Sequence, residues 1–171
     1  QEFTNTTTNL SDLFDADVYI ISISDDSINE LSKKLEFSNK LVVHTSGSIP
    51  LEGISSHNRR GVFYPLQTFS KDKKVNFKEV PLCLEAEEIN DLVLLKQLAG
   101  TISDNVYQIN SSQRKSLHVA AVFVCNFVNH LYHSSNMELI GYEDDDIYLG
   151  FLNLELADQT LHYIEMLEDF V

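Results

Sequence analysis

The sequence predicts an α/β protein in which a doubly wound, mainly parallel sheet is followed by an all-helical segment. Short β-branched runs alternate with segments whose apolar residues have helical spacing, and small polar residues follow the runs. The composition changes at Ser111, where a long apolar helical segment begins. We therefore expect an α/β domain over residues 1–110 and a helical domain over residues 111–171.

Short apolar runs predict the strands of the sheet. The expected strands are Val18–Ile23, Leu41–His44, Gly61–Tyr64, Val80–Leu84 and Asn105–Ile109. The first two are joined by a segment with capping residues and helical spacing, so we expect parallel neighbours, with Val62–Tyr64 beside them. Glu87–Ala99 has helical spacing, and Gly100 occupies the place of a C-terminal cap. The charged stretch Ser70–Lys74 predicts an exposed loop.

The segment after Ser111 predicts helical packing between chains. Ser112–His133 is one long, largely apolar helical segment, and Leu152–Phe170 is an amphipathic helix expected to pack on it. A helix that is apolar around most of its circumference needs burial on several sides, so we expect a homodimer; an intramolecular helical core is the alternative. The residues that support this expectation are Val119, Ala120, Val122, Phe123, Val124 and Phe127.

Composition limits the classes of partner. The 171 residues are 43% hydrophobic, enough for a buried core. Twelve Lys and Arg against 26 Asp and Glu give a net charge of −14, which repels phosphate backbones and acidic lipids, so no nucleic-acid or membrane partner is expected. Cys83 and Cys125 lie in apolar runs, as reduced core thiols do. Without a signal-like start or an apolar run of ~20 residues, a soluble cytoplasmic protein is expected.

Loops after the predicted strands are the first candidates for a binding site. In a doubly wound sheet, ligands bind beyond the carboxyl ends of the strands. Asp25 and Asp26 could face a ligand ribose, but acidic residues at a helix start are also explained by capping. Gln67 and Thr68 could contact a ligand or close a turn. The candidate binding residues are Ser24, Asp25, His44, Ser46, Gly47, Gln67 and Thr68.

A polar stripe crosses the apolar helix. Arg114 and His118 are four residues apart, and Asn129 lies eleven beyond His118, which at ~100° per residue returns to nearly the same face. Together with Asn126, these groups are costly to bury without partners, which favours a functional role for Arg114 and His118. For the two asparagines, that role and hydrogen bonding to neighbouring backbone are equally compatible with the sequence.

Two other chemistries are disfavoured. His130 and His133 are three residues apart on the helix, but no carboxylate or cysteine at suitable spacing completes a metal site, so none is expected. Ser46 lacks the strand–turn–helix flanks of a hydrolase nucleophile, and no G-x-S-x-G motif is present.

Three segments carry a family resemblance. His44-Thr45-Ser46-Gly47-Ser48, residues 64–69 (YPLQTF) and residues 113–131, from Gln113 to Leu131, resemble the signatures of an uncharacterised Rossmann-like oxidoreductase family related to pyrroline-5-carboxylate reductase. The similarity covers roughly Leu10–His133. It implies a nicotinamide-binding Rossmann domain joined to a helical, often dimer-forming domain, with NADP or NAD as cofactor.

The resemblance implies roles for the candidate residues. In a reductase acting on a small imine, keto or hydroxy substrate, Arg114 would hold a substrate carboxylate and His118 would transfer a proton. Asn126 or Asn129 would orient a carbonyl, and the loop residues after the strands would contact the cofactor.

One departure concerns the phosphate-binding loop. Such proteins begin with a strand and a G-x-G-x-x-G turn, whereas the first glycine here is Gly47 and no two of the six glycines are spaced as G-x-G. Either the sequence starts inside the domain or cofactor binding was lost. The rival hypothesis is therefore a non-catalytic Rossmann-like binding or dimerisation protein. Residues 137–150 do not match the family either.

The missing loop predicts a binding result for this chain. Without a glycine turn at a helix start to hold the pyrophosphate, the 171-residue chain should bind NAD or NADP weakly or not at all. Titration calorimetry measures this directly, and micromolar affinity would contradict it.

Overall fold

A five-stranded, mainly parallel sheet forms the centre of the protein, which confirms the predicted α/β class. The computed structural model describes residues 6–69 and 74–122. The strands are β1 (Val18–Ile21), β2 (Leu41–His44), β3 (Arg59–Pro65), β4 (Leu82–Ala86) and β5 (Val106–Gln108), in the order β1-β2-β3-β4-β5. All neighbours are parallel except β3 and β4, which are antiparallel. The three strands predicted to be neighbours are adjacent in the sheet.

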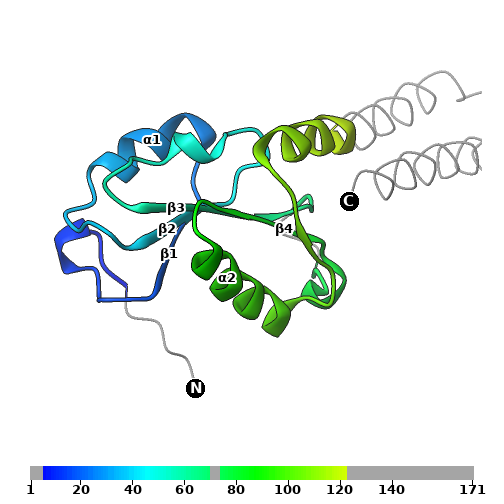
Figure 1. Cartoon of the computed structure of the whole chain (residues 1–171), viewed down its shortest axis with the longest axis horizontal. Coiled ribbons are helices and arrows are strands. Elements are labelled where there is room, and N and C mark those ends of the chain that lie inside the picture. The colour runs from blue at the N-terminus through cyan, green and yellow to red at the C-terminus, as the bar shows by residue number, and fades with distance from the viewer. Residues whose placement is uncertain (1–5, 70–73, 123–171) are drawn as a thin grey trace, which may run out of the picture. The chain divides into compact units, whose positions relative to one another are not determined.

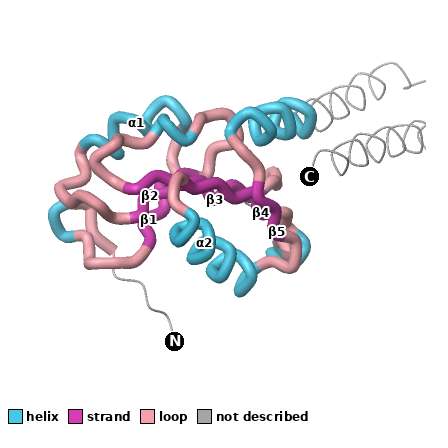
Figure 2. The backbone as a smooth tube through the Cα atoms, viewed as in Figure 1, coloured by secondary structure: helices cyan, strands magenta, loops and turns pink. Residues whose placement is uncertain are grey.

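Helices cover both faces of the sheet. In the described residues the α-helices are α1 (Asp25–Lys33), α2 (Ile89–Ile102) and a helix over residues 111–122, the last helix of the described chain. Single 3-10 turns lie at η1 (Leu10–Asp12), η2 (Leu51–Gly53) and η3 (Phe77–Glu79). Figure 1 shows α1 and the helix that begins at residue 111 on one side of the sheet and α2 on the other, and the tube in Figure 2 shows the same layers.

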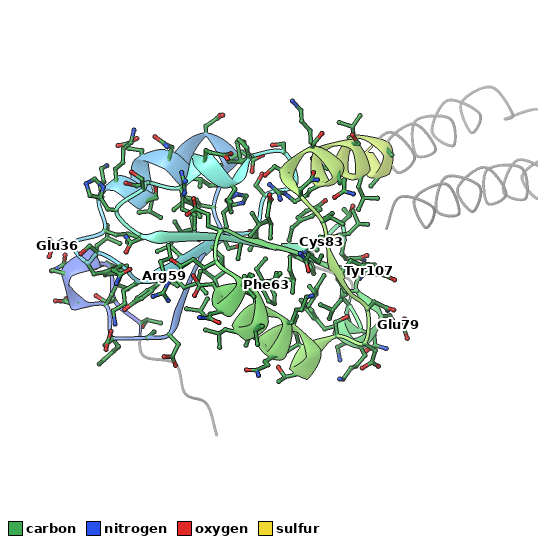
Figure 3. All side chains as sticks on the ribbon, in the orientation of Figure 1. Glu36, Arg59, Phe63, Glu79, Cys83 and Tyr107 are labelled. Carbon is green, nitrogen blue, oxygen red and sulfur yellow. The ribbon has the colours of Figure 1, made fainter. Side chains whose placement is uncertain are left out.

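The face under α2 holds the larger hydrophobic core. Successive side chains of a strand point to opposite faces, so Leu41 and Val43 of β2 share this face with Leu82 and Leu84 of β4. Phe63 points from β3 toward α2 (Figure 3). The helix contributes Leu95 and Ala99, both 0% exposed.

The opposite face has two smaller cores. One lies under α1 and gathers Ile21, Ile28, Val42 and Ile54. The other gathers Leu51, Val62, Tyr64, Cys83 and Ile109, with Leu117 of the last helix packed against it. This second core brings residues 111–118 onto the carboxyl-terminal half of β3 and onto β4.

Several predicted boundaries shift. β1 ends at Ile21, and the strands predicted at Val80–Leu84 and Asn105–Ile109 occupy Leu82–Ala86 and Val106–Gln108. The prediction that Gly100 caps a helix is wrong: α2 continues to Ile102, and the C-cap is Ser103. Gly100 has an ordinary negative φ inside the helix. The helix ends instead at Ser103, whose hydroxyl donates to Val80 O at 2.6 Å.

The described chain tests only the beginning of the helical segment. Residues 111–122 are helical, as predicted, whereas the rest of Ser112–His133, the Leu152–Phe170 helix and most of the Ser70–Lys74 loop lie outside the described residues. Residues 1–118 form one compact unit and residues 119–171 another. Within residues 6–69 and 74–122, no helix combines the length and apolar composition of a membrane span.

Replacing Gly100 or Gly61 by alanine should have opposite effects on stability. A Cβ at Gly100 meets no atom within 4 Å, whereas at Gly61 it would lie 2.8 Å from Val43 Cγ1 and 3.2 Å from Leu95 Cδ1. Gly100→Ala should therefore raise the free energy of unfolding by about 0.5–1 kcal/mol. Gly61→Ala should lower it by about 1–3 kcal/mol because Val43 of β2 and Leu95 of α2 both pack closely there. Chemical denaturation compares them, and equal effects would contradict the packing described.

Candidate functional site

Polar loops meet at the carboxyl ends of β1 and β2. Thr45 follows β2, and its N–H donates to Ile21 O at 3.2 Å while its hydroxyl lies 3.4 Å from Ser22 Oγ. Ser48 donates its hydroxyl to Asp25 Oδ2 at 2.5 Å. Parallel strands bring their carboxyl ends to one edge, so the loop after β1 and the loop after β2 lie together.

His44 is a fixed, neutral part of the loop after β2. Its ring is 0% exposed; Nδ1 accepts the N–H of Ser46 at 3.1 Å, and Nε2 lies 3.3 Å from Pro50 O. An acceptor at Nδ1 and a carbonyl beside Nε2 select the tautomer protonated on Nε2. Burial, reinforced by the positive charge of Arg114, lowers the pKa of His44 to about 4. The ring therefore shapes the loop and carries no charge at neutral pH.

Ser46 closes the turn that follows His44. Its hydroxyl oxygen accepts the N–H groups of Ser48 and Ile49, each at 3.1 Å. Ser46 is buried, and these bonds give its oxygen a structural role in holding the turn.

Gly47 allows two rings to approach the loop. A Cβ at this position would lie 2.5 Å from His118 Nδ1 and 2.8 Å from Tyr64 Cζ, closer than real Cβ contacts. Its φ is not positive, so the need for glycine here is one of space. The turn after β2 is thus shaped to accept Tyr64 from β3 and His118 from the last helix.

Tyr64 and His118 form a hydrogen-bonded pair at this place. The Tyr64 hydroxyl lies 2.9 Å from His118 Nδ1, and the rings meet edge to face with centroids 5.8 Å apart. Burial raises the pKa of Tyr64 to about 12, so the phenol keeps its proton at neutral pH. His118 is partly exposed, and its Nε2 has no hydrogen-bond partner among residues 6–69 and 74–122. The pair can hold a proton at Nε2, facing away from Tyr64.

Arg114 lies next to this pair but is bound within the protein. The side chain is 1% exposed, and Nη1 donates to Glu85 Oε2 in an ion pair with a carboxylate that is itself 16% exposed. Nη2 donates to Ile49 O at 2.7 Å and lies 3.2 Å from Ser111 Oγ. Ser111 donates its hydroxyl to Glu85 and accepts the N–H of Leu51. The guanidinium thus joins β4, the last helix and the loop after β2.

The structure gathers some predicted site residues and separates others. Asp25, His44, Ser46 and Gly47 lie in one group, and Arg114 and His118 face it. Ser24 is the N-cap of α1 and bonds Ser27. Asn126 and Asn129 lie outside the described residues.

Gln67 and Thr68 line a different hollow. They border a pocket of about 340 Å³ beside Lys74, Asn76 and Val80, of which the grouped residues form no part. In the described part of the chain, no three His, Cys, Asp or Glu side chains gather closely enough to hold a metal ion.

Sequence reasoning did not select Tyr64, Glu85 or Ser111. A charged residue at the end of the apolar run before Ala86 was a usable signal for Glu85. Tyr64 read as a core residue, and only the pairing of β3 with β4 reveals that it shares a sheet face with Glu85: Tyr64 is opposite Cys83, and Val62 is opposite Glu85. Burial raises the pKa of the Cys83 thiol to about 11, so this thiol stays protonated in the core.

One family profile and several solved structures match the chain. The profile, described as a domain of unknown function (DUF2520), matches residues 80–168. No functionally curated protein matches. A candidate NADP oxidoreductase from Bacteroides fragilis is similar with 41% identity and a TM-score of 0.69, over 93% of this chain and 62% of that protein. This chain therefore spans about three fifths of that relative's length.

Two more distant structures share the fold. A Thermotoga maritima protein is 22% identical with a TM-score of 0.68, over 87% of this chain and 60% of that one. A prephenate dehydrogenase from A. aeolicus, solved with hydroxyphenyl propionate and NAD+, is 15% identical with a TM-score of 0.56, over 95% and 70%. At such identities the likeness shows the Rossmann-like fold.

The buried neutral His44 predicts an acid-labile fold. The unfolded chain binds this proton with an ordinary pKa of 6.5 and the folded chain with a pKa of about 4, so protonation favours unfolding. The contribution of His44 is complete above pH 6.5 and is lost as the pH falls toward 4, amounting to roughly 3 kcal/mol.

Urea denaturation between pH 4 and 7 measures this loss. His44→Gln should flatten the pH dependence of the free energy of unfolding, and His57→Gln, which alters an exposed histidine, is the matched control. Parallel profiles for wild type and His44→Gln would contradict the prediction.

Proposed function

The chain belongs to the family of the domain of unknown function DUF2520, and from this premise we propose that it is part of an NAD- or NADP-dependent oxidoreductase. The substrate proposed is a small imine, keto or hydroxy compound. The observation that carries the proposal is the Tyr64–His118 pair, held against Gly47 beside the carboxyl ends of β2 and β3. A kinship with pyrroline-5-carboxylate reductase is part of the same proposal.

His118 is the proton donor of the proposed reaction. Reduction of a C=O or C=N bond needs a hydride on carbon and a proton on the heteroatom. When bound, the nicotinamide supplies the hydride. The imidazolium form of His118 donates Nδ1–H to the Tyr64 oxygen, which leaves Nε2–H for the substrate oxygen or nitrogen. Because the pKa of Tyr64 is about 12, its phenol orients the ring without giving up its own proton. In the oxidative direction, neutral His118 accepts the proton.

The described residues suit one end of a dinucleotide. Hydroxyl groups of Ser22, Thr45 and Ser48 at the strand ends can bond an amide or a ribose. The N-terminus of α1 does not suit a pyrophosphate, because Asp25 and Asp26 occupy its first turn and carry like charge. The nicotinamide end of the cofactor is therefore the part assigned to this chain.

A homodimer and a cytoplasmic location complete the proposal. Val119 and Val122 are 59% and 42% exposed, which is apolar surface that a second copy can cover. The net charge of −14 disfavours binding to acidic lipids and nucleic acids, which is compatible with a cytoplasmic protein that acts on a small molecule.

Hydride-transfer assays test the function. Protein produced from its native gene, incubated with NADH or NADPH and a panel of small imines and keto compounds, should consume the reduced nicotinamide. His118→Gln should lower kcat about 100-fold or more, and Tyr64→Phe about tenfold, because the first loses the acid and the second only its orientation. His57→Gln, an exposed histidine outside the site, is the matched control and should stay within about twofold of wild type.

Two results would overturn the proposal. Turnover by His118→Gln equal to that of the His57→Gln control would remove His118 from the reaction. Absence of both nicotinamide binding and turnover would favour a non-catalytic Rossmann-like binding or dimerisation protein.

A further inference from the structure

Arg114 joins two segments that are far apart in the sequence. Its Nη1 contacts Glu85 on β4, and its Nη2 contacts the carbonyl of Ile49 in the loop after β2. With 1% of the side chain exposed, the guanidinium is not available to a ligand as it stands. A substrate carboxylate would have to displace Glu85.

The spacing of the helix matches the spacing of the sheet. Glu85 is opposite Val62, so Glu85 and Tyr64 are separated by two residues along the strands, roughly 7 Å. Arg114 and His118 are four residues apart on a helix, roughly 6 Å. Arg114 contacts Glu85 while His118 contacts Tyr64. A movement of the helix that changes one of these contacts therefore changes the other.

Little freedom remains for His118. A Cβ at Gly47 would lie only 2.5 Å from His118 Nδ1, so the His118 ring is in tight contact with this loop. Since Ile49 is two residues after Gly47, the Arg114–Ile49 bond fixes the loop that forms this wall. The N–H of Leu51, in the same loop, donates to Ser111 Oγ at 3.0 Å.

We propose that Arg114 is a positioning residue, which with Glu85 sets the last helix and the loop after β2 so that His118 meets the Tyr64 hydroxyl. This inference rests on the proposed function, because the position of His118 matters for proton transfer. The buried ion pair is costly, because Arg114 Nε has no hydrogen-bond partner in the described residues. Apolar residues in place of a buried ion pair are often as stable, so stability alone does not explain the pair, whereas a positioning role does.

Histidine ring NMR tests the proposal without cofactor or substrate. In protein labelled with ¹⁵N-histidine, the signals of His118 are assigned as those that His118→Gln removes, and Tyr64→Phe gives their position when the hydrogen bond is absent. The double variant Glu85→Gln/Arg114→Met exchanges the ion pair for neutral side chains of similar length. Its His118 signals should move to the Tyr64→Phe position.

A second variant and a matched control separate positioning from general stability. Arg114→Lys keeps the charge but loses the fork that reaches both Glu85 and Ile49, so its His118 signals should move part of the way. Asp91→Asn/Arg59→Met removes another ion pair, between the half-buried Arg59 and the buried Asp91 (Nε to Oδ2, 2.9 Å). This pair lies at the far end of β3, so its removal should leave the His118 signals in place.

The outcomes separate this inference from the proposed function. Wild-type His118 signals in either folded Arg114 variant, or an equal displacement in the Asp91/Arg59 control, would overturn the positioning role. Moved signals in a protein that proves inactive with every substrate would support the positioning role while the proposed function fails.

Discussion

A buried guanidinium has to keep both its charge and its hydrogen bonds, and the arrangement of the site depends on how Arg114 does so. Glu85 supplies the opposite charge from β4, while Ile49 and Ser111 supply oxygen acceptors from the loop after β2 and from the helix itself. Losing one partner of such a pair leaves an uncompensated charge in the core, which typically costs about 3–5 kcal/mol. The helix at residues 111–118 is therefore held to one place on the sheet.

The other constraints of the site follow from this placement. Once the helix is fixed, His118 lies against the turn after β2, and only a glycine at position 47 leaves room for it. The turn has its own internal bonds: neutral His44 accepts from Ser46 N–H, and the Ser46 hydroxyl accepts from Ser48 and Ile49. Three features therefore act on the turn after β2, beside the Tyr64 hydroxyl. They are the protonation of His44, the packing at Gly47 and the ion pair of Arg114.

The sequence predicted the strands of the sheet because each is a short β-branched or apolar run bounded by turn residues, as Leu41–His44 illustrates. It failed at Gly100, where residue type suggested a cap, because the actual stop depends on a hydrogen bond from Ser103 to Val80 in another element. His118 was selected as a polar residue on an apolar helix, a local signal. Arg114 was selected by the same signal. The partners of these two residues, Tyr64 and Glu85, were not selected, because their proximity depends on the antiparallel register of β3 and β4 and on long-range packing.

The coupling between Glu85 and Arg114 tests most directly whether this ion pair holds the helix on the sheet. A double-mutant cycle of Glu85→Gln and Arg114→Met, measured as free energies of unfolding by chemical denaturation, isolates the pairwise contribution. If this ion pair holds the helix, each single variant is strongly destabilised, the double variant regains much of the loss, and the coupling free energy is about 2 kcal/mol or more. Additive losses, with a coupling within about 0.5 kcal/mol of zero, would contradict this role of the ion pair.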